Sequence, residues 1–66
     1  MTIHLNGQPY QAEADCTLSA LIASLALRRD GIAVAINGEV IPRVNHSQCR
    51  LQENDRVEII QAVGGG

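Results

Sequence analysis

The sequence has 66 residues, a net charge of −2 and one aromatic residue, Tyr10. A chain of this length forms one domain with a thin core, and its few dispersed arginines, without stacking aromatics, do not favour nucleic-acid binding. No apolar run approaches the ~20 residues of a membrane span, and no signal peptide opens the chain, so we expect a cytoplasmic protein.

The first predicted element is a β-hairpin over residues 1–12. Asn6 and Gly7 separate two stretches of alternating apolar residues, and this pair favours a two-residue turn because both positions need positive φ. The turn sets the register of the two strands. The side chains expected on the core face are Met1, Ile3, Leu5, Tyr10 and Ala12. Pro9 cannot donate a ladder hydrogen bond, so we expect the second strand at an edge of the sheet.

An amphipathic helix follows the hairpin. Thr17 is a plausible N-cap, and we expect the helix to reach Arg28 and Arg29, with Gly31 as its left-handed stop. The apolar positions fall at i, i+3, i+4 and i+7, which is one face of a helix. They are Leu18, Leu21, Ile22 and Leu25.

The second half of the chain begins with another hairpin, around Asn37 and Gly38, which places Val34 opposite Ile41 and Ala35 opposite Val40. We expect an irregular segment over residues 43–48 with one short helical turn, a brief strand over 49–51 and a turn over 53–55. The last strand covers residues 56–63. Alternation along it places Val57 and Ile59 in the core and Ile60 outside.

This order of elements predicts an α+β domain, because one helix can cover only one face of a sheet. The simplest closure sets the last strand beside the first, parallel to it, at the centre of the sheet. The expected architecture is the β-grasp of ubiquitin-like proteins, a mixed sheet of four to five strands packed on one helix. We assign residues 1–63 to this domain and residues 64–66 to a flexible glycine tail.

The tail itself is unusual. Gly64, Gly65 and Gly66 form a run that composition alone would give at one chosen end roughly a few times in ten thousand. Glycine loses more backbone freedom on ordering than any other residue, and these three have no side chains that could offset this loss by packing. The sequence therefore suggests a thin, extended and mobile segment with a purpose, although frayed ends are also common.

The potential metal-binding and redox residues are few. Cys16 and Cys49 are too few for a four-cysteine iron–sulfur site or a disulfide scaffold, and we interpret them as ordinary, reduced, small hydrophobic residues. His4 and His46 are isolated from them, and we expect both histidines at the surface. No metal site is expected.

Several stretches resemble the ThiS family, the sulfur carriers of thiamine thiazole biosynthesis. They are the Asn-Gly hairpin near the start, the short helix opening at Thr17, AINGEVIPR (35–43) and ENDRVEIIQAVGGG (53–66). The terminal diglycine, Gly65 and Gly66, is the most specific of these features. The chain departs from the family where a tryptophan often follows the Pro-Arg pair, and in having glycine at position 64.

The resemblance implies a carrier rather than an enzyme, with no cofactor of its own. A ubiquitin-activating-type adenylyltransferase would use ATP to adenylate Gly66. Sulfur from a sulfur-transfer protein or cysteine desulfurase would replace AMP, and the thiocarboxylate would pass its sulfur to thiazole synthase. The exposed sheet face beside the tail, with Ile60 and Val63, is the expected contact surface for these partners. Gly64 and Gly65 would thread the active site, and the free chain is expected to be a monomer.

Three alternatives remain from the sequence. The chain could carry sulfur for another pathway, such as molybdopterin, cysteine or a specialised metabolite. It could be a ubiquitin-like protein modifier, or a plain β-grasp interaction domain with an idle tail. The chain contains no lysine, so an activated tail could not acylate a side-chain amine of its own surface.

Overall fold

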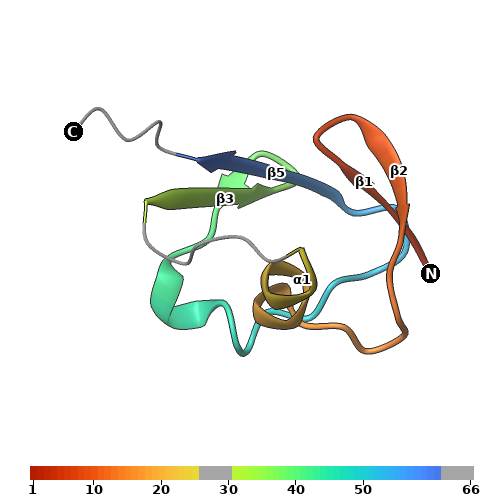
Figure 1. Cartoon of the computed structure of the whole chain (residues 1–66), viewed down its shortest axis with the longest axis horizontal. Coiled ribbons are helices and arrows are strands. Elements are labelled where there is room, and N and C mark those ends of the chain that lie inside the picture. Colours follow the sequence, from red (N-terminus) through yellow and green to blue (C-terminus); the bar gives the residue numbers. More distant parts are fainter. Residues whose placement is uncertain (26–30, 62–66) are drawn as a thin grey trace.

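Among the residues that the structure describes, five strands form one mixed sheet, and one α-helix lies against one face of it (Figure 1). The computed structural model describes residues 1–25 and 31–61. The elements in chain order are β1 (Thr2–Leu5), β2 (Gln8–Gln11), α1 (Leu18–Ser24), β3 (Ile32–Ile36), β4 (Glu39–Val40), the 3₁₀ turn η1 (Arg43–Asn45) and β5 (Arg56–Gln61). The boundary expected at residues 63 and 64 lies outside the described residues.

The strand order β2-β1-β5-β3-β4 places β5 at the centre of the sheet. β5 runs parallel to β1, with His4 opposite Arg56, and antiparallel to β3, with Val34 opposite Ile59. This arrangement confirms the β-grasp topology predicted from the sequence. β2 is an edge strand, as Pro9 indicated.

Both Asn-Gly turns have the predicted backbone. Asn6 and Asn37 have φ of 49° and 52°, and the glycine that follows each one has φ of 82° or 85°. These turns fix the registers, with Ile3 opposite Tyr10 in the first hairpin and Ala35 opposite Val40 in the second. The hairpin registers predicted from the sequence are therefore confirmed.

The helix begins where the sequence predicts and ends earlier. The hydroxyl of Thr17 accepts the backbone N–H of Ala20 at 3.1 Å, which confirms the N-cap. The helix ends at Ser24 with Leu25 as its C-cap, and the expected extension to the arginines falls outside the described residues. The Ser24 hydroxyl donates to the carbonyl of Leu21 at 2.8 Å, and such local bonds compete with helix continuation. Gly31 does have a positive φ of 76°, but it is not the cap of this helix, and residues 28 and 29 lie outside the described residues.

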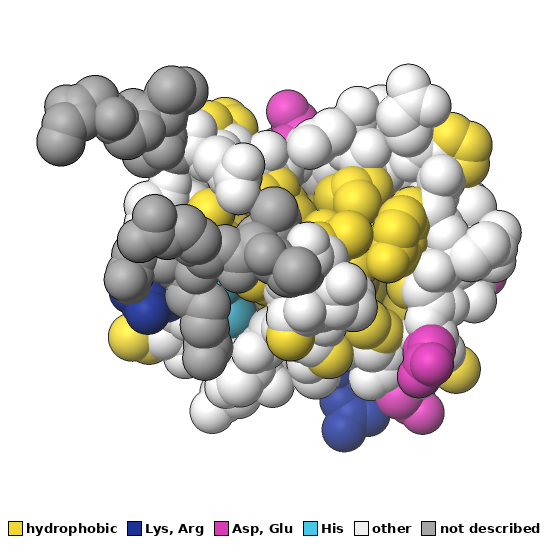
Figure 2. Space-filling model, viewed as in Figure 1, with side chains coloured by type: hydrophobic (Ala, Val, Ile, Leu, Met, Phe, Trp, Pro, Cys, Tyr) yellow, Lys and Arg dark blue, Asp and Glu magenta, His cyan; other side chains and the backbone are white. Residues whose placement is uncertain are grey.

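The core lies between the helix and the sheet and is entirely aliphatic. Its buried members are Ile3, Ala12, Leu18, Leu21, Ile22, Val34, Leu51, Val57 and Ile59. Hydrophobic side chains also reach the surface between α1 and the β1–β2 hairpin (Figure 2). Within the described ranges, no helix is long and apolar enough to cross a membrane.

Two expectations for the segment after β4 are wrong. His46 is buried rather than exposed, because its ring Nε2–H donates to the carbonyl of Ile41 at 3.0 Å. Residues 49–51 form only an isolated bridge, between Thr17 and Arg50, instead of a strand. The carbonyl of Cys49 accepts the N–H of Leu18 at 2.8 Å, so this segment pairs with the start of the helix and not with the sheet.

Candidate functional site

The candidate site is the C-terminal end of β5, from which the chain continues to its last residues. β5 ends at Gln61, at the end of the sheet that points away from the β1–β2 hairpin (Figure 1). Four of the site residues expected from the sequence, Val63 and Gly64 to Gly66, lie outside the described residues. The structure places the fifth, Ile60, one residue before the end of β5.

Ile60 points away from the helix and is 66% exposed. Neighbouring strands add small or apolar side chains on the same face, because alternate residues of a strand share a face and paired residues lie side by side. Ala33 lies opposite Ile60, and Ala35 lies opposite Val40, which is 68% exposed. We call these four residues the apolar strip (Ala33, Ala35, Val40 and Ile60).

Polar and charged side chains border the apolar strip. Glu58 lies opposite Ala35 of β3 on the same face. Arg56 lies opposite His4 of β1, the strand that pairs with the other edge of β5. A shallow hollow of about 530 Å³ opens here, lined by His4, Asn6, Gly7, Arg56, Val57 and Glu58. An exposed apolar strip with a charged rim is typical of a surface that binds another protein.

The side chain of Asn6 contacts β5 just before Ile60. Its Oδ1 accepts the backbone N–H of Ile59 at 2.8 Å, and its Nδ2 donates to the carbonyl of Ile59 at 3.3 Å. Sequence reasoning missed this role, because it treated Asn6 only as a turn residue. The sole signal was asparagine at a position where glycine would equally satisfy the backbone.

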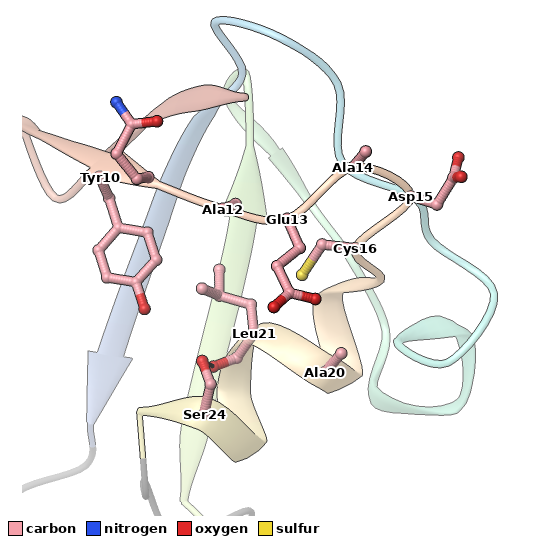
Figure 3. A pocket seen from close by; sticks show the side chains of 10 residues that line it. Tyr10, Ala12, Glu13, Ala14, Asp15, Cys16, Ala20, Leu21 and Ser24 are labelled. Atoms are coloured by element: carbon pink, nitrogen blue, oxygen red, sulfur yellow. Dashed lines mark hydrogen bonds between the residues drawn. The ribbon is translucent and has the colours of Figure 1, made fainter.

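A second cavity, of about 430 Å³, lies between α1 and the segment that joins it to β2. Figure 3 shows Tyr10, Glu13 and Cys16 around it. The Cys16 thiol donates to the carbonyl of Thr17 at 3.3 Å and has no histidine among the lining residues. The cavity therefore lacks the thiol–imidazole pair that nucleophilic catalysis uses.

Cys49 is also poorly suited to act as a nucleophile. Burial, and secondarily the negative charge of Asp55, raises the pKa of the Cys49 thiol above its ordinary value. A raised pKa keeps the thiol protonated at neutral pH, and the thiolate is the reactive form. Both cysteines are free, as the sequence suggested. No group of three or more His, Cys, Asp or Glu residues that could hold a metal ion occurs among the described residues.

Comparisons with known proteins agree with this geometry. A family model described as the ThiS family matches residues 3–66. The sulfur carrier protein ThiS of Escherichia coli is 35% identical over 66 residues, and the match covers all of both chains. A thiazole synthase of Magnetococcus marinus is 41% identical over the whole of this chain, which spans only 20% of that relative's length.

A solved structure extends the comparison to the fold. The thiamine biosynthesis protein (ThiS) from Geobacter metallireducens superposes with a TM-score of 0.83 at 28% sequence identity, and the match covers all of both chains.

Proposed function

The chain belongs to the ThiS family, and we propose that it is a sulfur carrier for thiazole formation in thiamine biosynthesis, with the carboxylate of Gly66 as the group that carries the sulfur. The observation that carries this proposal is the end-to-end match to a sulfur carrier protein, on a β-grasp whose central strand leads to the glycines. The chain is a carrier and not a catalyst, because its contribution to the reaction is the carboxylate itself.

The proposed chemistry begins with an unreactive group. A free carboxylate is a poor electrophile, because its charge opposes attack. One oxygen of the Gly66 carboxylate attacks the α-phosphorus of ATP, pyrophosphate leaves, and an acyl-adenylate forms. Hydrosulfide then attacks the acyl carbon and expels AMP, which leaves a thiocarboxylate.

The glycines suit the geometry of this step. The adenylyltransferase must bring the carboxylate within ~3–3.5 Å of the α-phosphate in a site that keeps water from the adenylate. Three extended residues span roughly 10 Å, at about 3.3–3.6 Å each. Gly64, Gly65 and Gly66 have no Cβ, so the proposed tail passes a narrow channel that a bulkier chain could not enter.

The apolar strip provides the docking surface that such a tail requires. Ile60 is exposed next to the end of β5, and Val63 follows three residues later in the sequence. We propose that both side chains contact the adenylyltransferase, a ubiquitin-activating-type enzyme. Docking here would bring the glycines to the entrance of that channel.

The remaining partners follow from the same proposal. Thiazole synthase is the proposed acceptor of the sulfur, supported by a relative of that name that includes a region similar to this whole chain. A cysteine desulfurase or a sulfur-transfer protein would supply the sulfur. Because activation consumes ATP, we place the reaction in the cytoplasm.

The test is an assay of activation with the adenylyltransferase from the same source. The enzyme should catalyse exchange of labelled pyrophosphate into ATP only when this chain is present, and a variant lacking Gly65 and Gly66 should give no exchange. No exchange above the background of the enzyme alone, with the full chain as with the truncated variant, would support a plain interaction domain. Covalent adducts of this chain on lysines of other proteins would instead identify a protein modifier.

A further inference from the structure

One side chain joins the first turn of the molecule to the strand that bears the proposed tail. β1 ends at Leu5, and the next residue, Asn6, turns away with a φ of 49°. Its backbone N–H still donates to the carbonyl of Val57 at 2.8 Å, as the next residue of a parallel strand would. The side chain then continues the ladder by accepting the N–H of Ile59 and donating to its carbonyl.

The side-chain amide of Asn6 thus supplies the acceptor and the donor that the backbone of β1 would supply if this strand continued past Leu5. Ile59 is only 8% exposed, and without this side chain its N–H and carbonyl would have no partner on the β1 side. The two bonds fix the peptide groups on both sides of Ile59. One of these groups is the link to Ile60, whose direction on the outer face therefore depends on Asn6.

We propose that Asn6 is a positioning residue, which acts through Ile59 to hold Ile60 and the end of β5 in the orientation that the adenylyltransferase binds. This inference rests on the proposed function, since it concerns the same docking surface. Loss of Asn6 should weaken docking and leave the chemical step unchanged, because its side-chain bonds go to the backbone of Ile59, whereas the proposed reacting group is the carboxylate of Gly66.

The chain offers a matched control in its second Asn-Gly turn. The Oδ1 of Asn37 accepts the N–H of Arg56 at 3.0 Å, and its Nδ2 donates to a carboxylate oxygen of Asp55 at 3.1 Å. Asn37 therefore makes the same number of side-chain bonds from the same kind of turn. It holds the opposite end of β5, roughly 13 Å from Ile60 at about 3.3 Å per residue.

The experiment compares Asn6→Gly with Asn37→Gly, because glycine keeps the positive φ and removes only the side chain. In the pyrophosphate exchange assay, we expect Asn6→Gly to raise the KM for this chain about fivefold with kcat unchanged. That change is equivalent to about 1 kcal/mol, the net worth of a typical hydrogen bond. Asn37→Gly should keep the wild-type KM. Asn6→Asp keeps the acceptor for the Ile59 N–H but sets a carboxylate oxygen against the Ile59 carbonyl, so its KM should stay raised.

Amide hydrogen exchange of the free chain reports the same effect locally. Exchange should accelerate at Ile59 and Ile60 in Asn6→Gly, and at Arg56 alone in Asn37→Gly. Equal KM values for wild type and Asn6→Gly, equal rises in the two glycine variants, or a wild-type KM in Asn6→Asp would overturn the assignment. If the wild-type chain is not activated at all, the proposed function fails, and this inference fails with it.

Discussion

Ile60 of β5 lies directly opposite Ala33 of β3 on the face of the sheet that the helix leaves uncovered. Ala33 adds only a methyl group beside the isoleucine, and 66% of Ile60 is exposed. The next strand pair repeats the pattern, with Val40 of β4 opposite Ala35 of β3. The result is an apolar strip that leads toward the end of β5.

Replacing Ile60 with threonine should weaken binding to the adenylyltransferase about tenfold and leave the stability of the free chain within ~0.5 kcal/mol. Threonine keeps a β-branched side chain suited to a strand but removes apolar area that docking would bury. Isothermal titration calorimetry measures the binding, and thermal unfolding measures the stability. The control is Val44→Thr, since Val44 is more exposed, at 83%, but lies on η1 outside the strip. If both variants bind equally well, the strip is not the docking surface.

Thr17→Ala should lower the free energy of unfolding by about 1 kcal/mol, because it removes the N-cap bond to Ala20. Thr17→Ser keeps the hydroxyl and should retain most of the stability. Urea unfolding followed by circular dichroism distinguishes the two. An alanine variant as stable as the serine variant would contradict the assigned cap.

His46 is 5% exposed, and its ring bonds to the carbonyl of Ile41. Its own backbone carbonyl accepts the N–H of Ser19 at 3.0 Å, so one residue ties the loop after β4 to both the second hairpin and the helix. His46→Ala should therefore be less stable than His46→Gln by at least ~1 kcal/mol, since only glutamine can still reach the carbonyl of Ile41. The denaturant midpoints of the two variants give this difference, and equal midpoints would show that the bond is dispensable.

The raised pKa of Cys49 predicts the direction of a pH effect. Folding disfavours the thiolate, so the contribution of this group to stability is complete below the unfolded pKa of about 8.5 and is lost as pH rises through the folded value. The free energy of unfolding should fall above pH ~8.5 more steeply in wild type than in Cys49→Ala. Parallel pH profiles for the two proteins would contradict this explanation.

Much of the fold could be predicted because its signals are local. Each Asn-Gly pair requires a positive φ at two successive positions, which fixes a two-residue turn and hence the register of both hairpins. Thr17 before the first apolar residue of the helix marks its start. The central position of β5 follows from the order of the elements. With one helix on one face of the sheet, the simplest closure sets the last strand beside the first, between the two hairpins.

The remainder depends on tertiary contacts that a sequence pattern does not encode. His46 lies in a polar stretch of the sequence. Its burial is tolerated because its ring bonds to the carbonyl of Ile41, a contact that the sequence pattern does not indicate. The side chains of Asn6 and Asn37 bond to β5, which is distant from both in sequence. At the candidate site, the exposure of Ile60 was predicted from strand alternation, whereas the side-chain hydrogen bonds from Asn6 to Ile59 were not.

The most direct test of the proposed function is the intact mass of this chain after incubation with ATP, its adenylyltransferase and sulfide. Replacing one carboxylate oxygen with sulfur adds roughly 16 Da, and a covalent change at the activated acyl group is confined to the last residue. We expect this gain in the wild-type chain, located in the C-terminal peptide, and no gain in a variant lacking Gly66. An unchanged mass with an enzyme that is active on its own carrier would contradict the role proposed for this chain.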